Sequence, residues 1–142
     1  FALCTLHFAL CTLHFALYTW PMTTPDPRLL TDRNIWLATT RPDGRPHLAP
    51  VWFVWVRDRA YICTPSKSVK GRNLAANPRV SFALENGDKG LVCEGIATRL
   101  ALPHPKDVLA AFKEKYNWDI PTDVAYDALI EIAPVKWPKI GV

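Results

Sequence analysis

The sequence predicts a small antiparallel β-barrel with a few accessory helices, and three observations support this fold class. From residue 34 onward, short runs rich in β-branched and aromatic residues are separated by turn signals. The turns between the first three runs are too short for the crossovers of a parallel sheet. The charge and apolar content of residues 22–142 is that of one ordinary domain with one core.

The first 21 residues differ from the rest of the chain, because they carry no charge and repeat the unit FALCTLH before a related unit, FALYTWP. A seven-base DNA word, TTTGCAC, encodes this heptad when it is read through three copies. A targeting segment is the alternative, but the stretch has neither a basic start nor a small-residue cleavage site. We therefore expect residues 1–21 to be a non-native leader of translated tandem repeats, and residues 22–142 to form the single domain.

Each expected strand is supported by its composition and by the turn that follows it. Residues 35–40 (IWLATT) are β-formers, and Gly44 in the next turn can adopt a positive φ. A charged turn at 57–59 separates the second strand from the third. The six expected strands are residues 35–40, 47–56, 60–64, 79–85, 90–102 and 126–132.

Three helical segments accompany these strands. Residues 23–33 are expected to form an arm with a short helix. Ser68 can cap a helix that runs to Asn77 and is stopped by Pro78. A third helix follows Pro105, where apolar residues recur at helical spacing, namely Val108, Leu109, Phe112 and Tyr116.

The second strand, 47–56, is apolar on both faces. One face would carry His47, Ala49, Val51, Phe53 and Trp55, and the other Leu48, Pro50, Trp52, Val54 and Val56. Such a strand is expected to be buried on both sides. One side can fill the barrel, and the other needs a second subunit or a flat ligand. Of the two tryptophans we favour Trp52 as the ligand or interface group and Trp55 as the core group.

Residues 64–79 (TPSKSVKGRNLAANPR) gather hydroxyls and cations where a helix begins. The hydroxyls belong to Thr64, Ser66 and Ser68, and the cations to Lys67, Lys70 and Arg72. Free N–H groups and the positive end of the helix dipole favour anions at such a point. Lys70 in the first turn is unfavourable for the helix itself, which indicates an anionic partner. The alternative is a capped surface helix with solvated charges.

Several other chemistries are disfavoured. The glycines form neither a dinucleotide fingerprint nor a phosphate loop, and there is no GxSxG elbow. Beyond residue 21 two histidines and two cysteines are too few for a metal site or a disulfide framework, so we expect no metal and a reducing, cytoplasmic setting. No basic stripe with interleaved aromatics suggests nucleic acid, and no later stretch is apolar enough to suggest a membrane partner.

Four segments, in order and with matching spacing, resemble the flavin-binding split-barrel superfamily of pyridoxamine 5'-phosphate oxidase-like proteins. These are 36–40 WLATT, 42–53 PDGRPHLAPVWF, 61–64 YICT and 68–82 SVKGRNLAANPRVSF. KYNWDI at 115–120 and YDALIEIAPVKW at 126–137 resemble its deazaflavin-dependent branch. The resemblance implies a mainly β fold, a six-stranded antiparallel split barrel of Greek-key type with a few short helices. It also implies a homodimer with the cofactor at the subunit interface.

The resemblance further implies which residues hold the cofactor. The backbone around Pro50, Val51, Trp52 and Phe53 would line the isoalloxazine ring, and Thr64, Ser68 and Lys70 would hold the phosphate. Where the oxidase branch has an arginine beside that lysine, this chain has Val69, so phosphate binding would lean on Lys67 or Arg72 instead, and the loop hydroxyl of Ser66 completes the predicted site. The Arg/His substrate segment of true oxidases has no counterpart at 137–139, so that activity is not expected.

The expected function is therefore an FMN- or deazaflavin-dependent oxidoreductase that transfers a hydride to or from a small organic substrate. The alternative is a non-catalytic carrier or sequestering protein for flavin or haem. No side chain is predicted as a catalytic acid or base. Trp118 is expected either to cover a partner's flavin or to close the core.

Overall fold

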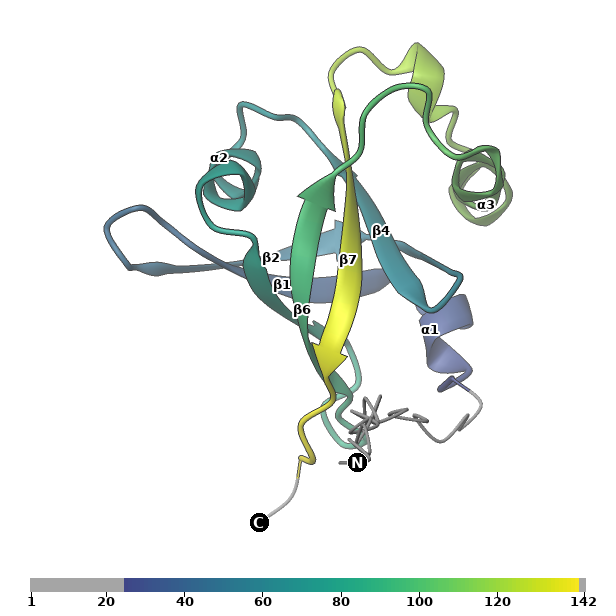
Figure 1. The fold of residues 1–142 in the computed structure, drawn as a ribbon. Helices are drawn as coiled ribbons and strands as arrows, with labels where there is room; N and C mark the ends of the chain where they lie inside the picture. The colour runs from purple at the N-terminus through teal and green to yellow at the C-terminus, as the bar shows by residue number, and fades with distance from the viewer. Residues whose placement is uncertain (1–24, 141–142) are drawn as a thin grey trace, which may run out of the picture.

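The computed structural model describes residues 25–140, which form a curled, seven-stranded antiparallel sheet in the order β2-β1-β5-β6-β7-β4-β3 (Figure 1). The predicted class, a mainly β split barrel with short helices, is confirmed. The expected leader, residues 1–21, lies outside the described part. Within that part no helix is both long and apolar enough to span a membrane.

The helices and strands of the described residues have the following bounds, in chain order. They are α1 (Arg28–Thr31), β1 (Asn34–Thr40), β2 (Pro46–Trp52), β3 (Val54–Val56), β4 (Arg59–Thr64), α2 (Val69–Ala76), β5 (Arg79–Leu84), β6 (Val92–Arg99), α3 (Lys106–Tyr116), η1 (Ile120–Thr122) and β7 (Ala128–Lys136).

The predicted second strand is divided in two at Phe53. β2 pairs with β1, whereas β3 pairs with β4 at the other end of the strand order. β2 and β3 are the two edge strands, so the chain crosses from one edge of the sheet to the other at this residue. The sheet must curl to let one short connection join its two edges. The expectation of one strand over 47–56 was wrong because the backbone of Phe53 bonds to a tyrosine hydroxyl, that of Tyr116, instead of a neighbouring strand.

The last two strands also differ from their predicted bounds. β6 is shorter than 90–102, because its pairing with β5 begins at Val92 and its pairing with β7 ends at Arg99. β7 extends four residues past the predicted end at Ile132, because beyond a bulge at Glu94/Gly95 it continues to pair with β6 as far as Lys136. The apolar pattern predicted where these strands lie, and the partner strands set where they stop.

The barrel interior is filled by alternate residues of the strands. On β1, Ile35 and Leu37 point inward and are almost fully buried, whereas Trp36 between them points outward. On β4 both faces are buried, since Ile62 belongs to the interior and Tyr61 to a separate cluster outside the barrel. Other large buried members of the interior are Phe53, Phe82, Leu84, Ile130 and Ile132.

Helix α3 covers the outer face of the barrel at β3, β4 and β7. Its inward residues Val108 and Phe112 are fully buried and belong to the same cluster outside the barrel as Tyr61. Figure 1 shows α2 and α3 on opposite sides of the barrel, with β6 and β7 between them. The strand residues buried beneath α3 are Val54, Tyr61, Cys63 and Leu129.

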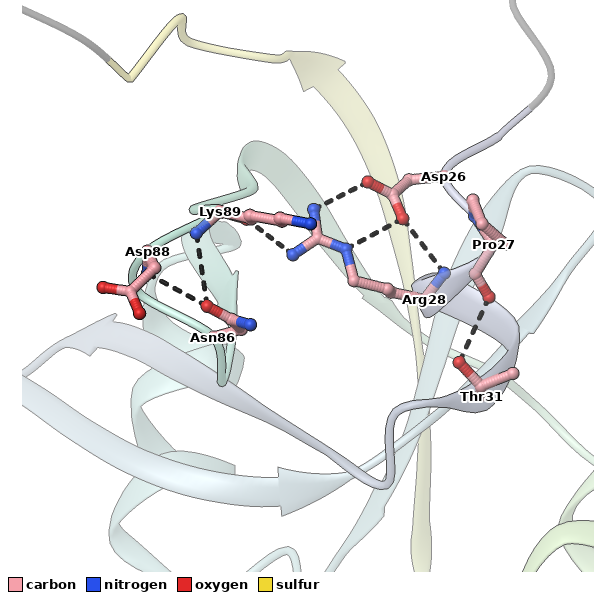
Figure 2. A network of polar contacts seen from close by, with 7 residues as sticks. All are labelled: Asp26, Pro27, Arg28, Thr31, Asn86, Asp88 and Lys89. Atoms are coloured by element: carbon pink, nitrogen blue, oxygen red, sulfur yellow. Dashed lines mark hydrogen bonds and ion pairs between the residues drawn. The ribbon is translucent and has the colours of Figure 1, made fainter.

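Helix α1 is attached to the turn between β5 and β6 by a polar network (Figure 2). The guanidinium of Arg28 forms an ion pair with Asp26 at 2.7 Å and also donates to the carbonyl of Lys89. The turn itself is held by Asn86, whose side-chain oxygen accepts from the N–H groups of Asp88 and Lys89. These contacts place the chain before β1 beside the barrel, next to the point where β2 ends.

Candidate functional site

The outward face of β1 and β2 is apolar and is not covered by any other part of residues 25–140. Leu48 is 60% exposed, Trp52 44% and Trp36 41%. The register pairs Trp36 with Pro50, so these side chains form one continuous surface. Within residues 25–140 the expectation that β2 is buried on both sides is therefore not met, and the outward face stays open to solvent.

The four residues predicted to line the ring differ in the direction of their side chains. Pro50 and Trp52 expose their side chains on the outward face, whereas Val51 and Phe53 point into the barrel. Val51 and Phe53 can therefore contribute only backbone groups to a ligand on that face. Trp55, on β3, packs against the barrel interior and lies 6.0 Å from Trp137 between ring centroids, which agrees with its predicted place in the core.

The loop before α2 is tightly built around Ser68. Its hydroxyl caps the helix by accepting from the N–H of Gly71 at 3.1 Å, as the sequence predicted, and lies 3.2 Å from the fully buried hydroxyl of Thr64. A Cβ at Gly71 would come within 2.5 Å of the carbonyl oxygen of Pro65. The close approach of helix and loop therefore depends on glycine at this position.

Ser66, in the same loop, binds the carboxylate of Asp127 through two hydrogen bonds. Its N–H donates to Asp127 at 2.7 Å and its hydroxyl donates to the other carboxylate oxygen at 2.6 Å. These hydrogen bonds lower the pKa of Asp127, with a smaller contribution from Arg99. An external anion would have to compete with Asp127 for Ser66, a partner that sequence analysis missed because it lies 61 residues away.

The predicted cations are not gathered at one point. Lys67 is exposed and Lys70 half-buried, and neither forms an ion pair within the described residues. Arg72 lies instead along a shallow cleft of about 230 Å³ together with Arg41 and Arg45. The structure therefore separates Arg72 from Ser66, which lines a different, smaller cavity beside Arg99.

A row of aromatic rings connects the outward face to the Ser66 loop. Trp118 lies edge-on to Trp52 at 5.9 Å and to Tyr126 at 5.0 Å between ring centroids. Tyr126 precedes Asp127, the carboxylate that Ser66 holds. Trp118 also packs against Phe112 in the cluster beneath α3, so its predicted role in closing the core is observed, and a role over a partner's flavin stays a prediction.

Two residues at the end of α3 meet the break between β2 and β3. Tyr116 stacks on Trp52 with a centroid distance of 4.6 Å and an interplanar angle of 9°. Lys115 donates to the carbonyl of Phe53 at 3.0 Å, and burial lowers the pKa of its ammonium to about 8. The sequence pattern placed Tyr116 on the apolar face of the helix only and gave no signal for Lys115.

The remaining polar candidates do not form a reactive centre. Burial raises the pKa of the Cys63 and Cys93 thiols to about 12, which leaves both protonated and unreactive. His47 is half-buried, and its Nδ1 has no hydrogen-bond partner in the described part of the chain. Across residues 25–140, no cluster of three or more histidine, cysteine or acidic side chains is placed to hold a metal ion.

Comparisons with known structures agree with this architecture. An F420 reductase is 26% identical with a TM-score of 0.64, and the match covers 80% of this chain and 96% of that one. The conserved hypothetical protein Rv2991 from Mycobacterium tuberculosis is 28% identical, covering 77% and 75%, with a TM-score of 0.58. HutZ, a haem storage protein from Vibrio cholerae, shares the fold at 20% identity, covering 73% and 82%, with a TM-score of 0.64.

A search of curated proteins found no match. The family model described as pyridoxamine 5'-phosphate oxidase matches residues 28–140, which is nearly the whole described part of the chain. The match includes the outward face of β2, the capped loop before α2 and the aromatic row between them. The chain therefore belongs to the pyridoxamine 5'-phosphate oxidase family of split-barrel proteins.

Proposed function

We propose that the protein is a homodimeric oxidoreductase that binds a flavin or deazaflavin against the outward face of β2. The observation that carries this proposal is the exposed apolar surface of Trp36, Leu48, Pro50 and Trp52. An aromatic row leads from this surface to the start of α2, where Lys67 and Lys70 form no ion pair with any described residue. A flat tricyclic ring with a phosphate matches both features, an apolar surface at one end and cations at the other.

The second subunit would be another copy of this chain, placed so that the two outward faces meet. Large exposed apolar surfaces are rare on monomers, and a twofold interface uses the same surface on both subunits. Each copy would then cover the other's Leu48 and Trp52. The proposal thereby supplies the cover that the apolar second strand lacks within one chain.

The loop before α2 fits a phosphate in part. Lys70 and Lys67 are available as cations, and Ser68 places a hydroxyl at the start of the helix, whereas the fully buried Thr64 could act only through its contact with Ser68. Ser66 would join them only if Asp127 released it. FMN and a deazaflavin share a ring and a phosphate, and the likeness to an F420 reductase supports the deazaflavin.

When bound, such a cofactor supplies a ring that accepts or donates a hydride. The chain's own contribution is to bind the phosphate end, to orient the ring along β2 and to exclude water from the interface. The outward side chains Trp36, Leu48, Pro50 and Trp52 include no acid or base, so we assign no catalytic residue. With both described cysteines buried and free, we place the protein in a reducing, cytoplasmic setting.

The test is a titration of the purified protein with FMN and, separately, with a deazaflavin, followed by absorption and fluorescence. Lys70→Ala is expected to weaken binding about tenfold, the effect of one lost charge-assisted hydrogen bond. Lys113→Ala, an equal charge change on the exposed side of α3, serves as the matched control. Unchanged affinity in Lys70→Ala would remove the phosphate assignment, and binding of neither cofactor would remove the proposed function.

The carrier alternative is separated from the enzyme by turnover. The absence of an acid or base among the outward side chains Trp36, Leu48, Pro50 and Trp52 is equally compatible with a protein that only stores its ligand. Reduction of the bound cofactor, followed by its reoxidation by a small organic acceptor, supports the oxidoreductase. A cofactor that stays bound but is never reduced or reoxidised would favour the carrier.

A further inference from the structure

The ladder between β1 and β2 ends at an unusual point. The last pair in this register is Asn34 with Trp52, and the next would be Arg33 with Phe53. The hydroxyl of Tyr116 lies between these two residues, 3.0 Å from the N–H of Phe53 and 2.6 Å from the carbonyl of Arg33. A side chain from α3 therefore stands where a strand-to-strand hydrogen bond would otherwise form.

The hydrogen bonds around this hydroxyl have one assignment that satisfies every group. Tyr116 has a single hydroxyl hydrogen but lies 2.6 Å from two carbonyls, those of Arg33 and Phe53. Lys115 donates to the Phe53 carbonyl as well, at 3.0 Å. The hydroxyl can therefore accept from the Phe53 N–H and donate to the Arg33 carbonyl, while the Lys115 ammonium donates to the Phe53 carbonyl. Burial raises the pKa of Tyr116 to about 12, so the donor hydrogen is retained at neutral pH.

The ring of the same tyrosine fixes the neighbouring tryptophan. It lies nearly parallel to the Trp52 indole at 4.6 Å, and the guanidinium of Arg33 approaches both rings, at 5.6 Å from Trp52 and 5.1 Å from Tyr116. One side chain thus holds the Phe53 peptide through its hydroxyl and the Trp52 indole through its ring. Residues 52 and 53 are the end of the segment that faces the proposed cofactor.

We propose that Tyr116 is a positioning residue that separates β2 from β3 at Phe53 and holds Trp52 in the orientation that the cofactor site requires. The proposal deepens the proposed function and rests on it for the cofactor. Tyr116 acts through Trp52 and Phe53, so it need not touch the bound ring. The position of α3, and not only β2 itself, then determines the shape of the site.

Three substitutions separate the parts of this arrangement. Tyr116→Phe keeps the ring on Trp52 and removes the hydroxyl, whereas Tyr116→Leu removes both. Lys115→Met leaves the Tyr116 hydroxyl free to bond the Phe53 N–H. Tyr126→Phe is the matched control, because the Tyr126 ring also belongs to the aromatic row and its hydroxyl makes no hydrogen bond within residues 25–140.

The first measurement needs no cofactor and follows hydrogen exchange at the Phe53 amide. In Tyr116→Phe exchange is expected to be about tenfold faster than in the wild type, since one buried hydrogen bond is lost. Lys115→Met and Tyr126→Phe are expected to leave the rate unchanged. Equal rates in Tyr116→Phe and the wild type would overturn the proposal even if the proposed function failed, because this amide reports on the hydroxyl alone.

The second measurement uses the visible circular dichroism of FMN or of a deazaflavin, whichever the wild type binds. A merely structural role for Tyr116 would lower the fraction of folded protein but leave the spectrum of the bound cofactor unchanged. A positioning role predicts a changed spectrum and about five- to tenfold weaker binding in Tyr116→Phe, with a larger change in Tyr116→Leu. An unchanged spectrum in both variants, with normal folding, would overturn the proposal.

Discussion

The two outer faces of the barrel differ in how they are covered. Beneath α3, the outward residues Tyr61, Cys63 and Leu129 are at most 6% exposed. On the outward face of β1 and β2, Trp36, Leu48 and Trp52 are 41–60% exposed. Both faces are apolar, but within residues 25–140 a helix covers only one of them. We propose that another molecule covers the other face, and the following changes test that proposal.

The largest effect is expected on the covered face. Phe112→Ala removes a fully buried ring between α3 and the strands, and should lower the free energy of unfolding by about 3–5 kcal/mol. Trp36→Ala, on the uncovered face, should cost less than about 1 kcal/mol in dilute, monomeric protein. Urea denaturation of both variants at low protein concentration makes the measurement. Equal losses would contradict the distinction between the two faces.

The next effect is on association. Leu48→Asp places a charge on the uncovered face and should weaken the dimer at least about 100-fold, or about 3 kcal/mol, without changing the far-ultraviolet spectrum. Leu30→Asp is the matched control, since Leu30 is 57% exposed against 60% for Leu48 but lies on α1. Sedimentation velocity across a concentration series decides the outcome. If both variants dimerise like the wild type, the interface lies elsewhere.

A smaller effect concerns Lys115, on the helix that covers one face and reaches the other. Its pKa is about 8 in the folded chain against an ordinary 10.5, mainly because of burial. Between these values the unfolded chain binds the proton and the folded chain does not, so stability should rise with pH across this window. The gain attributable to Lys115 should be about 1–2 kcal/mol between pH 8 and 10 and should be absent in Lys115→Met. An identical pH dependence in the variant would contradict the assignment.

The smallest expected signal is the absence of labelling at Cys63 and Cys93, read site by site by peptide mass spectrometry. Cys63 lies beneath α3 and Cys93 inside the barrel, and the pKa of each is about 12. A disulfide reagent at pH 8 should modify neither in the native protein. In Phe112→Ala, loosening of α3 should expose Cys63 before Cys93. Simultaneous labelling would mean that the two clusters unfold together.

The sequence predicted those parts of the molecule that depend on neighbouring residues. The capping of α2 by Ser68, the apolar face of α3 with Val108 and Phe112, and the apolar outward face of β2 all follow from local pattern. The break at Phe53 does not, because the hydroxyl that bonds the Phe53 backbone there belongs to Tyr116, 63 residues later. The partner of Ser66 was missed for the same reason, since Asp127 reaches the loop only through the pairing of β4 with β7.

The candidate site shows the same limit. The hydroxyls and cations of residues 64–72 were correctly placed at a helix start, but local sequence does not give the direction of each side chain. Arg72 lines the cleft that also contains Arg41 and Arg45. Of the three predicted cations, only Lys67 and Lys70 therefore remain for the loop. The spacing of hydroxyls and cations in the sequence therefore identified the region, and the tertiary fold determined which way each cationic side chain points.

The central claim is that the uncovered face of β2 is a shared, cofactor-binding interface. Sedimentation velocity of the wild type and Leu48→Asp, each titrated with FMN and with a deazaflavin, tests it most directly. We predict a wild-type dimer that binds one of these cofactors, and a folded Leu48→Asp monomer that binds it at least about tenfold more weakly. A monomeric wild type, or a monomeric variant that binds the cofactor as tightly as the wild type, would contradict the account.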